Sequence, residues 1–201
     1  MRALLFFALT ISTLSFAVER PGGLNHTAVG EKAGTYEVLL SPALTLSPSG
    51  AYLSSEFRYQ ASEDLSIAGG FGSGEVGFNL GGNVIWYVAP DLESQPAFAV
   101  LGGLYFNRFD NNNYFVVKVT PIVSKEFRTG WGSVSPYAGM HVTPSFRLNE
   151  ASNQIALKTS TGLQFKVKEL GGLQLWSEFG VGLVNANHEV VVGLSYPFAD
   201  I

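Results

Sequence analysis

The sequence contains no cysteine, few charged residues and, beyond Phe16, no long apolar run. Without cysteine, an exported chain cannot be a small module held together by disulfides. No stretch after Phe16 approaches the roughly 18 consecutive apolar residues that a membrane-spanning helix requires. The 12 basic and 16 acidic residues give a net charge of −4, and the basic residues are scattered. This charge distribution excludes a nucleic-acid-binding surface.

The low fraction of charged residues also indicates what surrounds the protein surface. Charged residues make up 14% of the chain, against about 25% in ordinary soluble domains. Glycine is abundant, at 23 of 201 residues. A protein of this size that faces water normally covers itself with lysine and glutamate. The composition therefore indicates that much of the surface lies in an environment other than water.

The N-terminal stretch MRALLFFALTISTLSFAVER combines one basic residue, an apolar core and a small-residue cleavage site. Arg2 precedes the apolar run, and Ser15 and Ala17 flank Phe16. This pattern predicts a secretory signal peptide over residues 1–17, cleaved after Ala17. Residues 18–34 are polar and contain glycine, which is typical of a flexible periplasmic leader. We expect the rest of the chain to form one domain over residues 35–198, followed by a short tail at 199–201.

From residue 35 onward, segments of alternating hydrophobicity are separated by clusters of turn-forming residues. The segments are approximately 35–47, 50–62, 64–72, 76–89, 95–109, 113–128, 132–148, 152–168, 172–184 and 187–198. Short connections between consecutive strands predict an antiparallel up-and-down arrangement. We expect ten strands, or eight if the short segment 64–72 merges with a neighbour. Pro42 and Pro121 fall inside strands, where we expect local bulges.

The alternation in NQIALKTSTGLQFKVKE (residues 153–169) leaves open which face is inside the barrel. A soluble lipocalin-like carrier would turn Leu157, Leu163 and Phe165 inward, whereas a membrane barrel would turn them toward lipid. Three features favour the membrane barrel. The polar face is rich in small residues, aromatic residues gather near strand ends as in interfacial girdles, and a closed sheet pairs every backbone group as lipid demands. Many segments also reach about 12–17 residues, close to the length that crosses a membrane with rims.

On this interpretation the polar face of the strands lines the lumen. Ten charged or titratable side chains are predicted to face it: Glu37, Glu56, Arg58, Lys118, His141, Arg147, Lys158, Lys166, Glu178 and Glu189. Both signs of charge are present, and side chains nearly fill a barrel of this size. An unpaired buried charge is strongly destabilising, so we expect ion pairs across the lumen.

The C-terminal stretch VVGLSYPF resembles the terminal assembly signal of bacterial outer-membrane β-barrel proteins, with Gly193, Tyr196 and Phe198 at the matching positions. The sequence departs from that signal in two ways. Val191 stands where a polar residue is usual, and Ala199, Asp200 and Ile201 follow the final aromatic residue. The resemblance implies an all-β, closed, antiparallel transmembrane β-barrel in the cell outer membrane. It also implies outer-membrane lipid and the barrel-insertion machinery as partners.

The expected function is that of a structural outer-membrane barrel or a narrow porin-like one. An outer-membrane lipid-modifying hydrolase that uses His141 and Ser145 is an alternative, because both share the predicted lumen face with Glu178. The soluble periplasmic carrier is another alternative. No cofactor is expected, and no metal site either, because His26, His141 and His188 lack ligand spacing.

Overall fold

The computed structural model describes residues 26–46, 49–109, 111–148 and 153–199. The predicted signal peptide, residues 18–25 of the leader and residues 200–201 of the tail lie outside these ranges. One 3₁₀ helix, η1 (Lys168–Leu170), accompanies the strands. Within the described ranges, no helix combines the length and the apolar character needed to cross a membrane.

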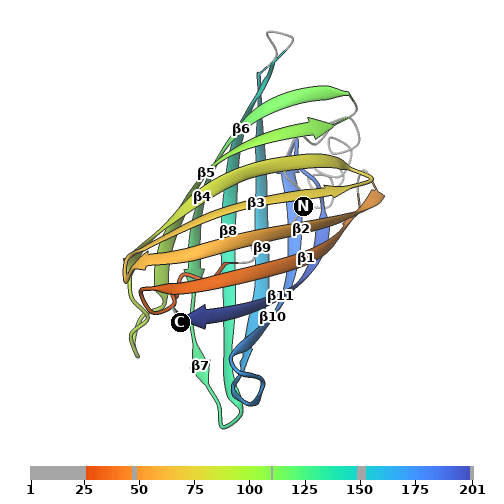
Figure 1. Ribbon diagram of the computed structural model, residues 1–201. Coiled ribbons are helices and arrows are strands. Elements are labelled where there is room, and N and C mark those ends of the chain that lie inside the picture. Colours follow the sequence, from red (N-terminus) through yellow and green to blue (C-terminus); the bar gives the residue numbers. More distant parts are fainter. Residues whose placement is uncertain (1–25, 47–48, 110, 149–152, 200–201) are drawn as a thin grey trace, which may run out of the picture.

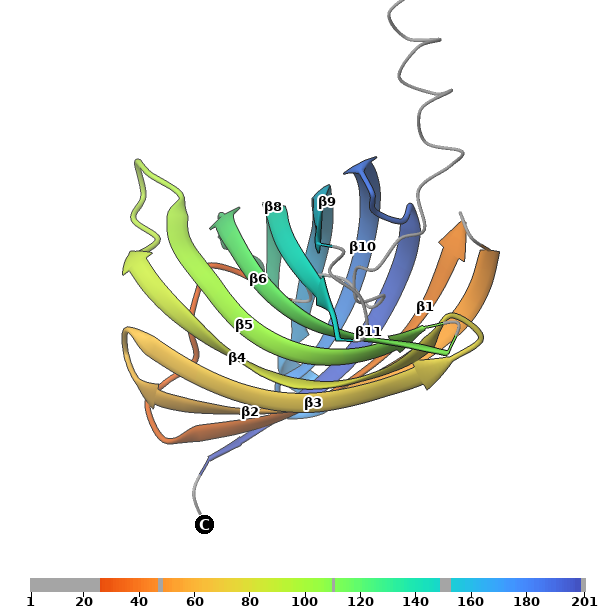
Figure 2. The same ribbon diagram turned by 90° about the horizontal axis from the view of Figure 1, so that it is seen from above.

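The strands form one closed antiparallel sheet (Figures 1 and 2). They are β1 (Thr35–Leu46), β2 (Ser49–Ser62), β3 (Leu65–Gly74), β4 (Gly77–Ala89), β5 (Ala97–Phe109), β6 (Asn112–Ser124), β7 (Phe127–Arg128), β8 (Gly132–Arg147), β9 (Asn153–Val167), β10 (Leu173–Val184) and β11 (Glu189–Ala199). Each long strand pairs with the next along the chain. The ring closes because β1 pairs with β11 and β6 pairs with β8, while the two-residue β7 lies beside the start of β8.

The predicted up-and-down barrel of ten strands is confirmed, and the eight-stranded alternative is wrong. The ten long strands contain 10 to 16 residues each. The sequence segment 64–72 forms the separate strand β3. The segment 113–128 is interrupted after Ser124, because Lys125 and Glu126 turn away to bond the loop between β4 and β5.

The alternation along β9 shows how the strands are oriented. Ile155 and Leu163 are 57% and 39% exposed, whereas Lys158 and Gln164 are 0% and 3% exposed. Leu157 and Phe165 lie on the same strand face as Leu163. The apolar face of β9 therefore points outward and its polar face points into the barrel, opposite to what a lipocalin-like carrier requires.

The expectation of bulges at the two strand prolines is wrong. The β1–β11 ladder is interrupted beside Pro42 but resumes in the same register, and the β6–β8 ladder does so beside Pro121. Proline lacks only one donor, and that donor would face a single neighbouring strand, so the other ladder continues unbroken through each proline. Register shifts occur instead near strand ends, between Gln60 and Ser62, Tyr87 and Ala89, and Gly182 and Val184.

The two ends of the barrel differ in their connections. Thr35 pairs with Ala199, so β1 begins where β11 ends; we call this the terminal end. The turns between β1 and β2, β3 and β4, β5 and β6, β8 and β9, and β10 and β11 lie at the opposite end and are short. The longer connections, between β4 and β5 and between β6 and β8, lie at the terminal end.

Candidate functional site: the charged lumen and the N-terminal segment

A cluster around Arg58 lies inside the barrel toward its terminal end. Glu37 and Arg58 are directly opposed in the β1–β2 register, and Arg58 Nη1 lies 2.5 Å from Glu37 Oε2. Arg58 Nη2 lies 3.3 Å from Glu56 Oε1. Asn83 Nδ2 donates to the other oxygen of Glu56 at 3.0 Å. All four residues are buried, and one guanidinium is shared between two carboxylates.

A second ion pair bridges three strands. Lys158 Nζ on β9 lies 2.7 Å from Glu189 Oε1 on β11, and both side chains are almost completely inaccessible. Gly180 on the intervening β10 leaves the necessary room. A Cβ at Gly180 would lie 3.0 Å from Cγ of Glu189 and 3.3 Å from Cδ of Lys158. The absence of a side chain there allows the pair to form across β10.

Aromatic side chains on β8 and β10 add further hydrogen bonds to the lumen. Tyr137 donates to Glu178 Oε2 at 3.0 Å, and its ring packs edge-on against Trp176 with 5.9 Å between centroids. Trp176 Nε1 donates to Ser195 Oγ at 2.9 Å. The Tyr137 ring lies against the wall at Gly162, where an added Cβ would be 2.5 Å from the ring.

His141 lies at the centre of a hydroxyl pair rather than a catalytic triad. Its Nδ1 is 3.2 Å from Thr120 Oγ1, and its Nε2 is 3.0 Å from Ser160 Oγ. Ser145 lies four residues further along β8 and donates instead to the backbone carbonyl of Gln154. The structure therefore does not bring His141 and Ser145 together as the hydrolase alternative requires.

The structure buries eight of the ten side chains predicted to line the lumen. These are Glu37, Glu56, Arg58, Lys118, His141, Lys158, Glu178 and Glu189. The other two are half-buried and lie toward opposite ends of the barrel. Arg147 donates to Asn112 Oδ1 near the β5–β6 turn, and Lys166 contacts Glu31 near the terminal end.

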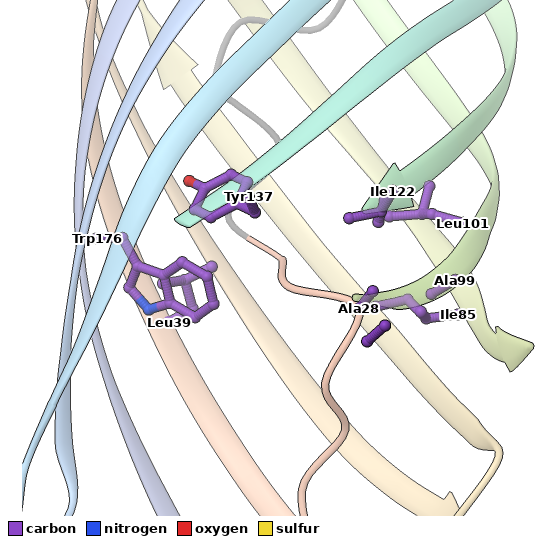
Figure 3. Packing of buried hydrophobic residues seen from close by; sticks show 9 residues of the cluster. Ala28, Leu39, Ile85, Ala99, Leu101, Ile122, Tyr137 and Trp176 are labelled. Atoms are coloured by element: carbon purple, nitrogen blue, oxygen red, sulfur yellow. The ribbon is translucent and has the colours of Figure 1, made fainter. Parts of the chain in front are cut away.

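Residues 26–34, which we call the N-terminal segment, enter the barrel at its terminal end: residues 26–28 are buried, residues 29–31 are partly buried, and Lys32 and Ala33 are exposed. His26, Thr27 and Ala28 are 3%, 4% and 2% exposed. Ala28 belongs to a buried cluster with Ile85 and Ala99. Figure 3 shows Ala28 on a coil segment that is separate from the strands of the barrel wall. Sequence reasoning did not identify this segment as part of the site. Its polar, glycine-containing composition carries no strand or helix pattern from which docking could be inferred.

The N-terminal segment is attached by polar contacts to widely separated strands. The backbone N–H of Ala28 donates to Ser124 Oγ on β6 at 2.9 Å. His26 Nε2 lies 3.4 Å from Glu56 Oε1 on β2. The N–H of Gly34 donates to the carbonyl of Gln60, also on β2, at 2.9 Å.

Glu31 makes the outermost of these attachments. Its Oε1 accepts hydrogen bonds from Lys166 Nζ at 2.5 Å and from Gln174 Nε2 at 2.9 Å. Burial opposes ionisation of Glu31, but the charge of Lys166 and the two hydrogen bonds outweigh it and hold the pKa of this carboxyl below its ordinary value. The side chains of Glu31 and Lys166 remain 27% and 22% exposed, so this contact is open to solvent.

The residues of the proposed assembly signal lie on two faces of β11. Gly193 is buried opposite Trp176, while Tyr196 and Phe198 are 48% and 38% exposed. The Phe198 ring stacks on Tyr36 with 5.8 Å between centroids, and Tyr36 also stacks on Tyr59 at 4.8 Å. These rings form an outward-facing aromatic patch near the terminal end.

The described residues contain no group of three or more histidine, cysteine, aspartate or glutamate side chains that could hold a metal ion. The arrangement instead consists of carboxylates matched to nearby cations and hydrogen-bond donors. Such an arrangement can close the lumen, lock the strands together or provide a narrow polar path.

Comparisons with known proteins gave matches among solved structures. No protein-family model matches the sequence, and no curated protein matches it. Among solved structures, the KdgM porin matches with a TM-score of 0.44 and 9% identity, over 81% of this chain and 99% of that chain. The translocator domain of the autotransporter NalP from Neisseria meningitidis matches with a TM-score of 0.41 and 11% identity, over 98% and 95%. Ail, the attachment invasion locus protein of Yersinia pestis, matches with a TM-score of 0.30 and 11% identity, over 83% and 99%. At TM-scores below 0.5 these matches carry no argument about the fold or the function of this chain.

Proposed function

We propose that this chain is an integral β-barrel of the cell outer membrane, with a polar, ion-paired lumen and a structural or narrow porin-like role. One observation carries the proposal: apolar side chains lie outside and charged ones inside. Leu44, Phe71 and Trp86 are 57–58% exposed, whereas Lys158 and Glu189 are each 0% exposed.

This distribution is unfavourable in water. Burying apolar surface is worth about 25 cal/mol per Å², and soluble monomers rarely expose apolar patches beyond a few hundred Å². The exposed large apolar side chains occur on every long strand of the barrel. Contact with acyl chains would remove this surface from water, and the closed sheet leaves no lipid-facing backbone edge to be satisfied.

The contacts inside the lumen favour a closed or narrow interior over a wide pore. The Arg58 cluster, the Lys158–Glu189 pair and the Tyr137–Trp176 contact each join different strands. The N-terminal segment adds further material at the terminal end. These features support a structural role, with narrow conduction as the second form of the same proposal.

We further propose that the barrel-insertion machinery recognises Gly193, Tyr196 and Phe198. The outward aromatic pair is positioned at the end of the strand that closes the ring with β1. An even number of long strands places both ends of the barrel domain on one side. Insertion from the periplasm would keep the terminal end on that side.

Fractionation and gel mobility test the proposal. The processed chain should partition with outer membranes and should migrate differently in detergent gels before and after boiling, because a closed barrel resists unfolding in detergent. A folded, monodisperse species purified in buffer without detergent would contradict it. Large and stable conductance steps in planar bilayers would contradict the closed lumen and leave the location intact.

A further inference from the structure

We infer that the N-terminal segment (residues 26–34) is a dissociable plug, a peptide ligand carried by the chain itself, whose departure opens the terminal end of the lumen to ions. This inference rests on the proposed function, because it requires the barrel to lie in a membrane.

The N-terminal segment crosses the interior instead of lining one side. It contacts β2 through Glu56 and Gln60, and β6 through Ser124. Its Glu31 reaches β9 and β10 on the other side of the ring. Figure 2 shows β2 across the ring from β9 and β10. A segment attached to both sides obstructs the passage between them.

The N-terminal segment can dissociate while the strands of the barrel remain paired. Residues 26–34 belong to no strand, whereas β1 begins at Thr35 and is paired on both sides. The apolar part of the attachment consists of Ala28, with Val29 partly buried beside it. Hydrogen bonds and ion pairs hold the rest, and an accessible one joins Glu31 to Lys166 and Gln174.

The fit is close at one further point. A Cβ at Gly30 would lie 3.0 Å from Cε2 of Tyr87 and 3.1 Å from Nε2 of Gln60. The N-terminal segment therefore passes directly over the Tyr87 side chain, and glycine allows this close approach. Specific polar partners, a small buried residue and a close approach together describe a peptide-binding site at the barrel mouth.

A reversible crosslink tests the plug in the full-length chain. Ala28 and Ser124 are adjacent, with 2.9 Å between the Ala28 nitrogen and Ser124 Oγ, and the sequence has no other cysteine. The double variant Ala28→Cys/Ser124→Cys should therefore form one disulfide that holds the segment in place. In planar bilayers, the oxidised protein should show at least about tenfold fewer openings than the same sample after reduction. The disulfide keeps the segment next to its binding site, so the released state is rarely populated.

A second variant loosens the plug without cysteine. Glu31→Gln keeps the shape of the side chain and removes its ion pair with Lys166. Because this pair is partly exposed, its loss should raise open probability by about twofold to fivefold. Glu169→Gln is the matched control, since Glu169 is an exposed carboxylate in η1 at the same end of the barrel. It should conduct as the parent does.

The possible failures are distinguishable when membrane insertion is measured on every sample. Inserted, heat-modifiable protein that conducts equally in the oxidised, reduced and Glu31→Gln forms would overturn the plug. Inserted protein that never conducts would also overturn it, while leaving a structural barrel standing. Protein that does not enter membranes would instead contradict the proposed function. If the cysteine pair does not fold, the comparison of Glu31→Gln with Glu169→Gln alone decides.

Discussion

At the scale of single residues, the lumen contains buried ion pairs, as in Arg58 with Glu37 and Lys158 with Glu189. The Lys158–Glu189 pair is the most enclosed of them. A buried ion pair is weak as a source of stability, because both ions lose their hydration. Removing one partner is much worse, because the remaining charge is left without compensation.

The first prediction concerns this pair. Lys158→Met should lower the free energy of unfolding by about 3–5 kcal/mol, because Glu189 would remain buried and unpaired. The double variant Lys158→Met/Glu189→Leu should recover much of that loss. Urea unfolding in lipid or detergent, followed by gel mobility, measures both. Arg128→Gln serves as control, since Arg128 is 86% exposed, and it should change stability by less than about 0.5 kcal/mol.

The second prediction concerns close packing at glycine. Gly162→Ala should destabilise the barrel by about 1–3 kcal/mol, because the new Cβ would overlap the Tyr137 ring and the Ser177 carbonyl oxygen. Gly102→Ala is the matched control, since nothing lies within 4 Å of a Cβ at that position. If the two variants were equally stable in the same unfolding assay, the prediction that the Tyr137 contact requires glycine at position 162 would be wrong.

Parity along each strand predicts which residues share a strand face, but it cannot predict their partners. Side chains on the same face of one strand are spaced along it by the rise of the strand, so their hydrogen-bond partners come from neighbouring strands. Which residues meet depends on the register between strands, and this cannot be read from one strand alone. His141 therefore contacts Thr120 on β6 and Ser160 on β9 rather than Ser145 on its own strand.

At the scale of elements, the ten strands could be predicted because turn residues separate segments with a clear two-residue period. The end of β6 could not be predicted in the same way. Lys125 donates to Asp91 Oδ1 at 2.5 Å, and the N–H of Glu126 donates to Asp91 Oδ2 at 2.6 Å. These contacts join two loops distant in sequence, so local alternation through residue 128 gave no sign of the break. The docking of residues 26–34 is likewise determined by strands distant in sequence.

The third prediction concerns pH and the N-terminal segment. The pKa of Glu31 is lowered in the folded state, so its contribution is complete above the ordinary carboxyl value of 4.5 and is lost as pH falls through the lowered folded value. Acidification from the ordinary value through the lowered folded value should therefore weaken this attachment and increase the fraction of molecules in which residues 26–34 are released, while the strands remain paired. Hydrogen exchange of the segment, measured across this range, follows the release. Glu31→Gln should remove most of the pH dependence, and a segment equally protected at every pH would contradict the assignment.

The pKa of Asp91, in the loop between β4 and β5, is also lowered in the folded state. Its partial burial raises the pKa, but hydrogen bonds from Lys125 and from the backbone of Glu126 outweigh this and leave the pKa below the ordinary value. We expect this loop contact to weaken in the same acidic range. The barrel wall should not respond, since the contact lies between loops outside the ring of strands.

At the scale of the whole molecule, polarity is inverted with respect to a soluble protein. The fourth prediction follows from this inversion. Replacing an outward residue near the middle of a strand, as in Phe179→Arg on β10, should lower stability in lipid by about 2–4 kcal/mol, because a charge would face acyl chains. Replacing the exposed Glu169 by arginine in η1 is the control and should have little effect. Urea unfolding in lipid vesicles distinguishes the two.

The connections at the end of the barrel opposite the terminal end are short, and this limits the surface that the protein exposes there. The connection between β3 and β4 consists of Glu75 and Val76 alone, and the other connections at this end are also short. In the proposed orientation, with the terminal end in the periplasm, these short connections would face the medium. Connections of this length offer little surface to which antibodies or bacteriophages could bind.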